Sequence, residues 1–305
     1  MHGAIDLYAA MASLKADYEA QGAEVILADA GDYSQGTVYV SVHKGADAVT
    51  MMNATGYDVA TIGNHEFDYG YAQLAENMKA AKFKVLCADV LDADGKTIFD
   101  ANTIIEKGGV KIGFFGLETP EAQTKANPKL IEGLKFLAGK DGKELYACAD
   151  AQVKALKEQG ADLVVCLSHL GIDGSSEPYT SYDLAANVEG IDGHSHSVIT
   201  AGPNGEAIQS TGTAFANIGV ITIDNATKKI VGNELKGIWH KEKVEGKDVT
   251  VVDYKTRDEK VAAAAKAIIT PSTRPMARSL PSARSRSTAR RPPTATVTPR
   301  PTSAT

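Results

Sequence analysis

The sequence lacks long hydrophobic runs, is poor in cysteine, and has almost no arginine in its first 270 residues. No stretch approaches the roughly 18 apolar residues that span a bilayer, and no basic segment followed by an apolar run opens the chain. Of the three cysteines, Cys87 and Cys166 lie in apolar, strand-like stretches. This placement favours buried free thiols over disulfides or a zinc site.

Charge is distributed unevenly along the chain. Seven of the eight arginines follow Thr270, whereas all 38 acidic residues precede it, so the body is more acidic than the net charge of −6 indicates. An acidic body argues against nucleic acid as the main partner, because such partners need a basic face. Bound metal cations could offset an acidic site.

Apolar periodicity predicts alternating strands and helices, followed by short antiparallel strands. Helices are expected over residues 5–22, 46–56, 71–81, 143–159, 182–188 and 258–269, and strands over 25–28, 59–62, 84–90, 103–107, 110–116, 162–168, 207–212, 217–224, 229–237 and 249–254. This order predicts an α/β layered domain with mixed sheets.

The motif GNHEFDYG, residues 63–70, places an amide, an imidazole and carboxylates directly after the apolar run 59–62. Such a cluster is costly to bury without partners, which predicts a strand end that faces a metal or an anionic ligand. Within the motif, Glu66 is interpreted as structural and not catalytic. Loops seldom collect these residue types behind a strand without a chemical use.

Five of the seven histidines lie at strand ends or turns beside Asp, Asn or Gly, namely His2, His65, His169, His194 and His196. Strand ends at one edge of an open α/β sheet meet in space, and ligands bind there. Taken singly, His169 could cap a helix and Asp32 could form a turn. Taken together, imidazole, carboxylate and amide groups suit zinc, manganese or iron.

The last segment, residues 271–305, contains no Asp, Glu, Lys or Gly and seven of the eleven prolines. Such a composition cannot build a core, and disorder is expected. One interpretation is a basic arm for nucleic acid or an anionic surface. The favoured interpretation is a reading-frame error or a foreign extension, because arginine usage changes abruptly at this point.

The chain resembles the catalytic domain of the 5'-nucleotidase family within the calcineurin-like metallophosphoesterases. The matching motifs, in order, are MHG, DAGDYSQG, GNHEFDYG, SHLG and GHSH, and the resemblance covers roughly residues 2–269. It implies a layered α/β/β/α sandwich with mixed central sheets. It also implies a catalytic domain at residues 1–245 and a linker at 246–270 toward a nucleotide-binding domain that this chain lacks, with the anomalous tail at 271–305.

The resemblance further implies a centre of two divalent ions, zinc, manganese or similar. One ion takes His2, Asp32 and His196, and the other takes Asp32, Asn64, His169 and His194. The ions activate a water molecule that attacks the phosphoryl group. His65 and Asp68 match the catalytic dyad of the family, and the glycines at 63 and 70 are expected to let the loop bend.

Two departures from the family pattern bear on activity. The first motif, Asp-x-His-Gly, begins here at its second letter, so one Asp ligand is expected to be missing. The segment before GHSH offers only Val188 and Ile191 where the family has an apolar strand, which indicates a small deletion. Displaced ligands can cost orders of magnitude in rate.

The expected function is therefore metal-dependent hydrolysis of nucleotides or related phosphate esters by a monomer. The alternative is a truncated, inactive remnant that binds metal or phosphate. Family members are usually exported, so the resemblance implies the periplasm or the cell surface although no signal peptide is recognised.

Overall fold

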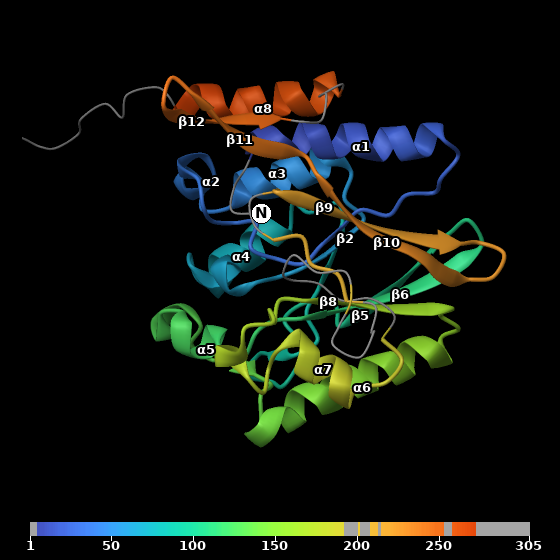
Figure 1. The fold of residues 1–305 in the computed structure, drawn as a ribbon. Helices are drawn as coiled ribbons and strands as arrows, with labels where there is room; N and C mark the ends of the chain where they lie inside the picture. The colour runs from blue at the N-terminus through green and yellow to red at the C-terminus, as the bar shows by residue number, and fades with distance from the viewer. Residues whose placement is uncertain (1–4, 192–200, 202–207, 213–214, 253–257, 273–305) are drawn as a thin grey trace, which may run out of the picture. The chain divides into compact units, whose positions relative to one another are not determined.

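The computed structural model describes residues 5–191, 201, 208–212, 215–252 and 258–272, and within them four layers succeed one another (Figure 1). Helices α1 (Tyr8–Ala20), α3 (Ala46–Thr55) and α8 (Glu259–Ser272) form one outer layer, and α6 (Lys143–Glu158) and α7 (Ser181–Asn187) form the other. Two sheets lie between them. The predicted α/β/β/α arrangement is confirmed.

The first sheet has the order β1-β2-β3 and is parallel throughout. Its strands are β1 (Ala28–Asp29), β2 (Val59–Thr61) and β3 (Lys84–Leu86). Each strand is joined to the next through a helical segment, which is the connection that parallel neighbours require. All three carboxyl ends therefore lie at one edge.

The second sheet has the order β5-β6-β8. Strands β5 (Asn102–Lys107) and β6 (Val110–Leu117) form an antiparallel hairpin, and β8 (Leu163–Ser168) runs parallel to β6. The predicted hairpin is confirmed, and this second sheet is mixed, as predicted. Side chains of β2 and β3 pack against those of β6 and β8 in one apolar cluster, so the two sheets share a core.

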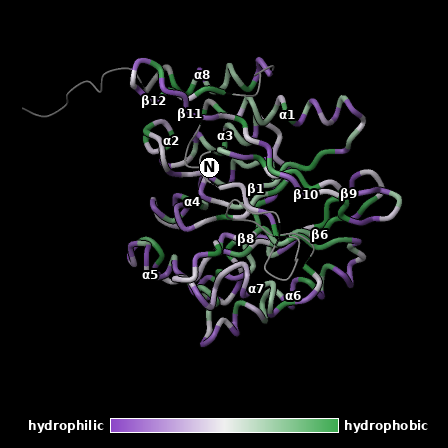
Figure 2. Tube along the Cα trace, in the orientation of Figure 1, coloured by the Kyte–Doolittle hydropathy of each residue, from purple (hydrophilic) through white to green (hydrophobic). Residues whose placement is uncertain are grey.

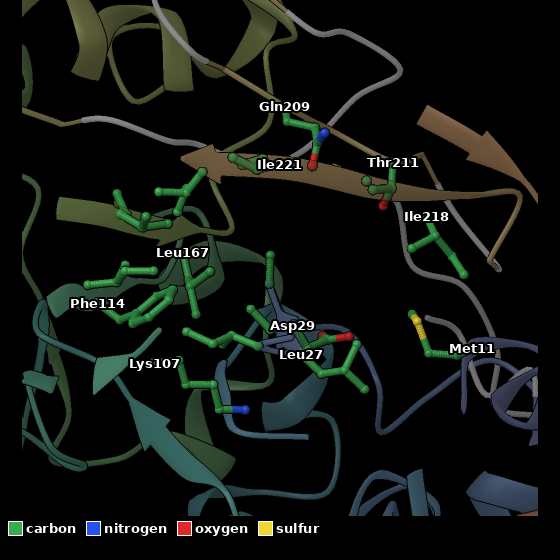
Figure 3. Close-up of a pocket in the computed structure, with 18 of the residues that line it drawn as sticks. Met11, Leu27, Asp29, Lys107, Phe114, Leu167, Gln209, Thr211, Ile218 and Ile221 are labelled. Atoms are coloured by element: carbon green, nitrogen blue, oxygen red, sulfur yellow. The ribbon is translucent and has the colours of Figure 1, made fainter. Parts of the chain in front are cut away.

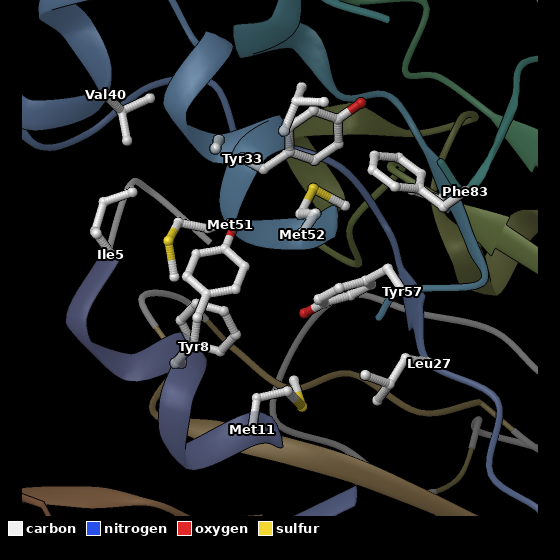
Figure 4. Close-up of a cluster of buried hydrophobic side chains, with 14 of the residues drawn as sticks. Ile5, Tyr8, Met11, Leu27, Tyr33, Val40, Met51, Met52, Tyr57 and Phe83 are labelled. Carbon is white, nitrogen blue, oxygen red and sulfur yellow. The ribbon is translucent and has the colours of Figure 1, made fainter. Parts of the chain in front are cut away.

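The outer helices cover the sheets with apolar side chains. Tyr8 of α1 and Met51 and Met52 of α3 are fully buried, and they join Tyr33 and Tyr57 in the large cluster of Figure 4. Helix α6 covers the second sheet with Leu145, Ala149, Val153 and Leu156. In Figure 2 the central strands are mostly green and the outer turns near α6 and α7 carry much purple. Burial of apolar surface thus fixes both faces of the sandwich.

The later strands form two antiparallel ribbons, β9 (Asn217–Asp224) with β10 (Lys229–Gly237), and β11 (Trp239–Val244) with β12 (Lys247–Val252). Strand β11 was not predicted. The strand predicted at residues 207–212 appears, in its described part 208–212, only as isolated bridge positions. The remaining elements are β4 (Val90–Leu91), which pairs with β7 (Lys135–Phe136), the short helices α2 (Val38–Val42), α4 (Tyr71–Met78) and α5 (Ala122–Lys125), and the 3-10 turns at residues 5–7, 64–67, 128–130, 140–142 and 174–176.

One predicted strand is interrupted. The sequence predicts a continuous strand over residues 84–90, but β3 ends at Leu86 and the short β4 begins at Val90. The backbone N–H of Cys87 leaves the ladder and donates to Asp100, and that of Ala88 donates to Gly116 in the second sheet. The turn that results puts Asp89 at a strand end.

The chain divides into one unit over Met1–Thr273 and a second over Arg274–Thr305. Helix α8, expected to be a linker, packs against α1 and α3 within the first unit. No helix in the described part of the chain is long and apolar enough to span a bilayer. The tail predicted to be disordered lies outside the described residues except for its first two positions.

Candidate metal and catalytic site

Three predicted site residues lie at the carboxyl ends of strands from both sheets. Asp32 follows β1, Asn64 begins the 3-10 turn after β2, and His169 follows β8 directly. The two sheets pack face to face with these ends at the same side, so residues separated by more than a hundred positions become neighbours. This is the convergence that the sequence predicts.

Asp32 and His169 are in direct contact. The Nε2 atom of His169 lies 3.1 Å from Oδ2 of Asp32, and both side chains are about nine-tenths buried. On the other side of the ring, Nδ1 lies 2.8 Å from the carbonyl oxygen of Ala30. Because a carbonyl only accepts, Nδ1 carries a proton and donates, which turns Nε2 toward the carboxylate. This is the arrangement in which a histidine is held for a metal ion.

The two motif loops approach so closely that only glycine fits between them. A Cβ atom on Gly63 would lie 2.5 Å from Oδ1 of Asp32 and 2.6 Å from Cε1 of His169, and one on Gly31 would lie 2.5 Å from the backbone nitrogen of Gly63. Gly31 and Asp32 both have positive φ, at 98° and 61°. The loop after β1 therefore turns sharply against the loop after β2, and Gly63 serves close approach where a bend was predicted.

Glu66 joins the same two loops through its carboxylate. Oε2 accepts hydrogen bonds from the backbone N–H groups of Gly63 at 2.6 Å and Asp32 at 2.7 Å, and Oε1 accepts from Tyr33 at 2.9 Å and Ser34 at 2.8 Å. The side chain is only 2% exposed. Glu66 is thus fully used in holding the backbone, which agrees with the structural role predicted for it.

His65 and Asp68 form a second pair beside the first. Nδ1 of His65 lies 2.8 Å from Oδ2 of Asp68, and the side chains are 36% and 31% exposed. The same Oδ2 accepts a hydrogen bond from Nε2 of Gln35 at 3.1 Å. The backbone N–H of His65 donates to Oδ1 of Asp32 at 3.1 Å, which links the exposed pair to the buried one.

Charges in the buried part of the site interact strongly. Burial alone would raise the pKa of Asp32, but the hydrogen bond and charge of His169 hold it below its usual range. Burial would lower the pKa of His169, yet the hydrogen bond to Asp32 raises it. Burial, and then the charge of Asp32, raise the pKa of Glu66 to about 7. The charges of Asp32 and His169 thus stabilise each other, whereas those of Asp32 and Glu66 repel.

The remaining predicted ligands, His2, His194 and His196, lie outside the described residues. Within the described part of the chain, no group of three or more His, Cys, Asp or Glu side chains is placed to hold an ion. Asp32 and His169 nonetheless supply a carboxylate and an oriented imidazole. Half-buried Asn64 directly follows Gly63, the residue that packs against both of these side chains. This donor set fits a borderline divalent cation.

Sequence reasoning missed two buried carboxyl groups at the same edge, Asp89 after β3 and Glu118 after β6. Both are 0% exposed. Glu118 follows an apolar strand, as Asp32 does, so the rule that selected the other strand-end residues would have found it. Asp89 was overlooked because the predicted strand ran through it.

A cavity of about 320 Å³ lies between the second sheet and β9, as Figure 3 shows. Phe114 and Leu167 line it from one side and Ile218 and Ile221 from the other, with Asp29 among its polar residues. Asp32, His65 and His169 are not among its lining residues. The cavity thus has both apolar and polar lining, and it reaches Ala30 and Gly31 of the loop that carries Asp32.

Comparison with known proteins identifies relatives of this chain in sequence and in fold. The family described as bacterial capsule synthesis protein PGA_cap matches residues 7–192. A 5'-nucleotidase of Vibrio cholerae is 35% identical over 159 residues, which are 52% of this chain and 28% of that protein. A 2',3'-cyclic-nucleotide 2'-phosphodiesterase/3'-nucleotidase of Haemophilus influenzae is 30% identical, over 85% of this chain and 40% of that protein.

Among solved structures, the calcineurin-like phosphoesterase YfkN of Bacillus subtilis superposes with a TM-score of 0.66 at 23% identity, covering 86% of this chain and 88% of that one. The fold is therefore that of the calcineurin-like metallophosphoesterases, a class that generally uses divalent metals. The chain belongs to the PGA_cap family. Its curated relatives include a 5'-nucleotidase, as its motifs predict. The chain spans less than half the length of both curated relatives.

Proposed function

We propose that this chain is a metal-dependent phosphoester hydrolase that removes phosphate from nucleotides. The observation that carries the proposal is the meeting of Asp32, His169 and the His65–Asp68 pair at one sheet edge. The names of the relatives, 5'-nucleotidase and nucleotide phosphodiesterase, supply the substrate class. Residues 1–245 would form the catalytic domain, located in the periplasm or at the cell surface.

The proposed metal ligands are those implied by the motifs. Asp32 would be shared between two divalent ions, Asn64, His169 and His194 would complete one site, and His2 and His196 the other. When bound, the ions would activate water and polarise the phosphoryl group. The chain itself orients His169 through the Ala30 carbonyl and holds the Asp32 backbone through Glu66.

His65 and Asp68 would act on the substrate directly. The imidazole is one-third exposed, so a phosphate can reach it, and Asp68 fixes the ring through Nδ1. The Nε2 edge would then donate to a phosphoryl or leaving-group oxygen, where negative charge develops in the transition state. Gln35 holds the shared Oδ2 of Asp68 from the other side.

The test is release of phosphate from adenosine 5'-monophosphate by the full chain in the presence of manganese or zinc. His65→Ala is expected to abolish turnover. The matched control is His43→Ala, which removes a histidine paired with Asp47 on the exposed surface. Metal binding without any turnover by the unmodified chain would contradict the proposal and favour a non-catalytic metal or phosphate binder.

A further inference from the structure

Three buried carboxyl oxygens beside the candidate site have no hydrogen-bond partner in the described structure. They are Oδ2 of Asp89 and both oxygens of Glu118. Both side chains are 0% exposed. A buried carboxyl group without partners is costly, so a native chain that keeps two of them together calls for a ligand that satisfies them.

The backbone fixes where these groups lie. The carbonyl oxygen of Leu117, the residue before Glu118, accepts a hydrogen bond of 2.8 Å from the backbone N–H of His169. The backbone N–H of Glu118 itself donates to Oδ1 of Asp89 at 2.9 Å. Glu118 is therefore tied on one side to the strand end that carries the candidate metal ligand, and on the other to the second orphaned carboxyl group.

The direction of the Glu118 side chain follows from strand alternation. Phe115 and Leu117 pack with α6 on the outer face of the second sheet, whereas Ile112 and Phe114 pack between the two sheets. Successive residues of a strand point to opposite faces, so position 118 continues the inner set. This is the side on which the first sheet and Asp32 lie.

The electrostatic surroundings agree with this placement. Burial raises the pKa of Glu118 well above its ordinary value, and the charges of Asp32, Asp89 and Glu66 raise it further. Four acidic groups thus act on one small volume at the sheet edge. A cation there would relieve this repulsion and make the ionised form of Glu118 favourable.

We propose that Glu118, held by Asp89, is a supporting carboxylate of the candidate metal centre, which accepts hydrogen bonds from water on the cation and strengthens cation binding by its charge. It is not proposed as a direct ligand, in agreement with the absence of a three-residue ligand cluster among the described side chains. This inference rests on the proposed function only in assuming that a divalent cation binds at Asp32 and His169.

The experiment measures manganese affinity of the full chain after removal of metal with a chelator, by calorimetry. Glu118→Gln is expected to weaken binding about tenfold or more, the usual effect of losing a supporting group around a metal. Asp89→Asn, which keeps an acceptor for the Glu118 N–H, is expected to weaken it similarly. Glu106→Gln, at an exposed position of β5, is the matched control and should leave the affinity unchanged.

The proposal also predicts a pattern of melting temperatures that a purely structural role does not. Under the proposal, metal-free Glu118→Gln should melt at the same temperature as the unmodified chain or higher, because a neutral amide replaces a carboxyl group whose pKa is raised by burial. Saturating manganese should raise the melting temperature of Glu118→Gln by less than it raises that of the unmodified chain. Equal manganese affinity and equal stabilisation in Glu118→Gln and the unmodified chain would overturn the proposal. If Glu118→Gln does not fold, Asp89→Asn decides the question by the same measurements.

The outcomes separate this proposal from the proposed function, because none of the readouts is turnover. A chain that binds manganese through Glu118 but releases no phosphate would contradict hydrolysis and leave this inference standing. If the unmodified chain hydrolyses nucleotides and Glu118→Gln binds manganese with normal affinity, the proposed function stands and the inference about Glu118 is contradicted.

Discussion

The Nδ1 atom of His65 lies 2.8 Å from Oδ2 of Asp68, and, besides the buried His169–Asp32 pair, the chain carries another histidine–aspartate pair joined through Nδ1. His43 and Asp47 are 2.7 Å apart, on the surface of the first unit. Of these two pairs, the His65–Asp68 pair is the one linked to Asp32, through the backbone N–H of His65. The His65–Asp68 and His43–Asp47 pairs have the same chemical groups in different places, so the effect of changing one can be compared with the effect of changing the other.

Asp68→Asn is expected to reduce kcat for nucleotide hydrolysis on the order of a hundredfold, because the imidazole loses the carboxylate that orients it and stabilises its charge. The free energy of unfolding should change by less than about 1 kcal/mol, since the pair is partly exposed. Steady-state kinetics and urea unfolding check both statements. Asp47→Asn should alter neither quantity, and a comparable loss of kcat in that variant would refute a specific role for Asp68.

Gly63→Ala is expected to destabilise the chain and to weaken manganese binding, because the added methyl group would meet Oδ1 of Asp32 and Cε1 of His169 at about 2.5 Å. Overpacking of this kind costs about 1–3 kcal/mol. Urea midpoints and calorimetry give the two measurements. Gly237→Ala is the control, since its nearest new contact is at 3.9 Å and its φ is not in the left-handed region. An unchanged manganese affinity in Gly63→Ala would argue against Asp32 and His169 as ligands.

Glu66→Gln is expected to lower the free energy of unfolding by about 2–4 kcal/mol. Its amide keeps one acceptor oxygen, and its NH₂ group faces backbone N–H donors that are then left unsatisfied. Chemical denaturation measures the loss. The comparison is Glu76→Gln, which removes an exposed ion pair with Lys79 and should have little effect. Similar denaturation midpoints for Glu66→Gln and Glu76→Gln would contradict the role of Glu66 in holding the two loops.

The metal-free chain is expected to lose stability as the pH rises from about 4 to about 7. Burial raises the pKa of Asp89 to about 7 and that of Glu118 well above its ordinary value. In this window the folded state keeps protons that the unfolded state releases, so the free energy of unfolding falls with pH, by up to about 1.4 kcal/mol per pH unit for each group. Urea titrations at several pH values test the slope, which should flatten in Asp89→Asn. A stability that rises across this range would contradict it.

The sequence predicts most of the scaffold because strand and helix periodicity is strong where burial is complete. Strand β8 coincides with an apolar run, and helix α6 coincides with a segment that has one apolar face. The predicted limits of each differ from the observed ones by a single residue. Strand β11, by contrast, is almost entirely exposed and rich in charge. Strand β11 is defined by its pairing with β12, and this pairing cannot be recognised from the residue types in β11.

The candidate site is less predictable than the scaffold. Motif spacing identifies Asp32, His65, Asp68 and His169. The bond from Gln35 to Asp68 depends on side-chain directions in three dimensions, and the turn at Asp89 depends on bonds to residues in another sheet. Neither contact leaves a local pattern in the sequence.

The carboxylate of Glu66 has a consequence for the motions of the native state. It binds backbone amides from two loops that lie about thirty positions apart, so neither loop can open while the other stays formed. The amide hydrogens of Asp32, Tyr33, Ser34 and Gly63 should therefore exchange with solvent deuterium as one cooperative unit. A single side chain thus makes the two loops that carry the candidate chemistry open and close together.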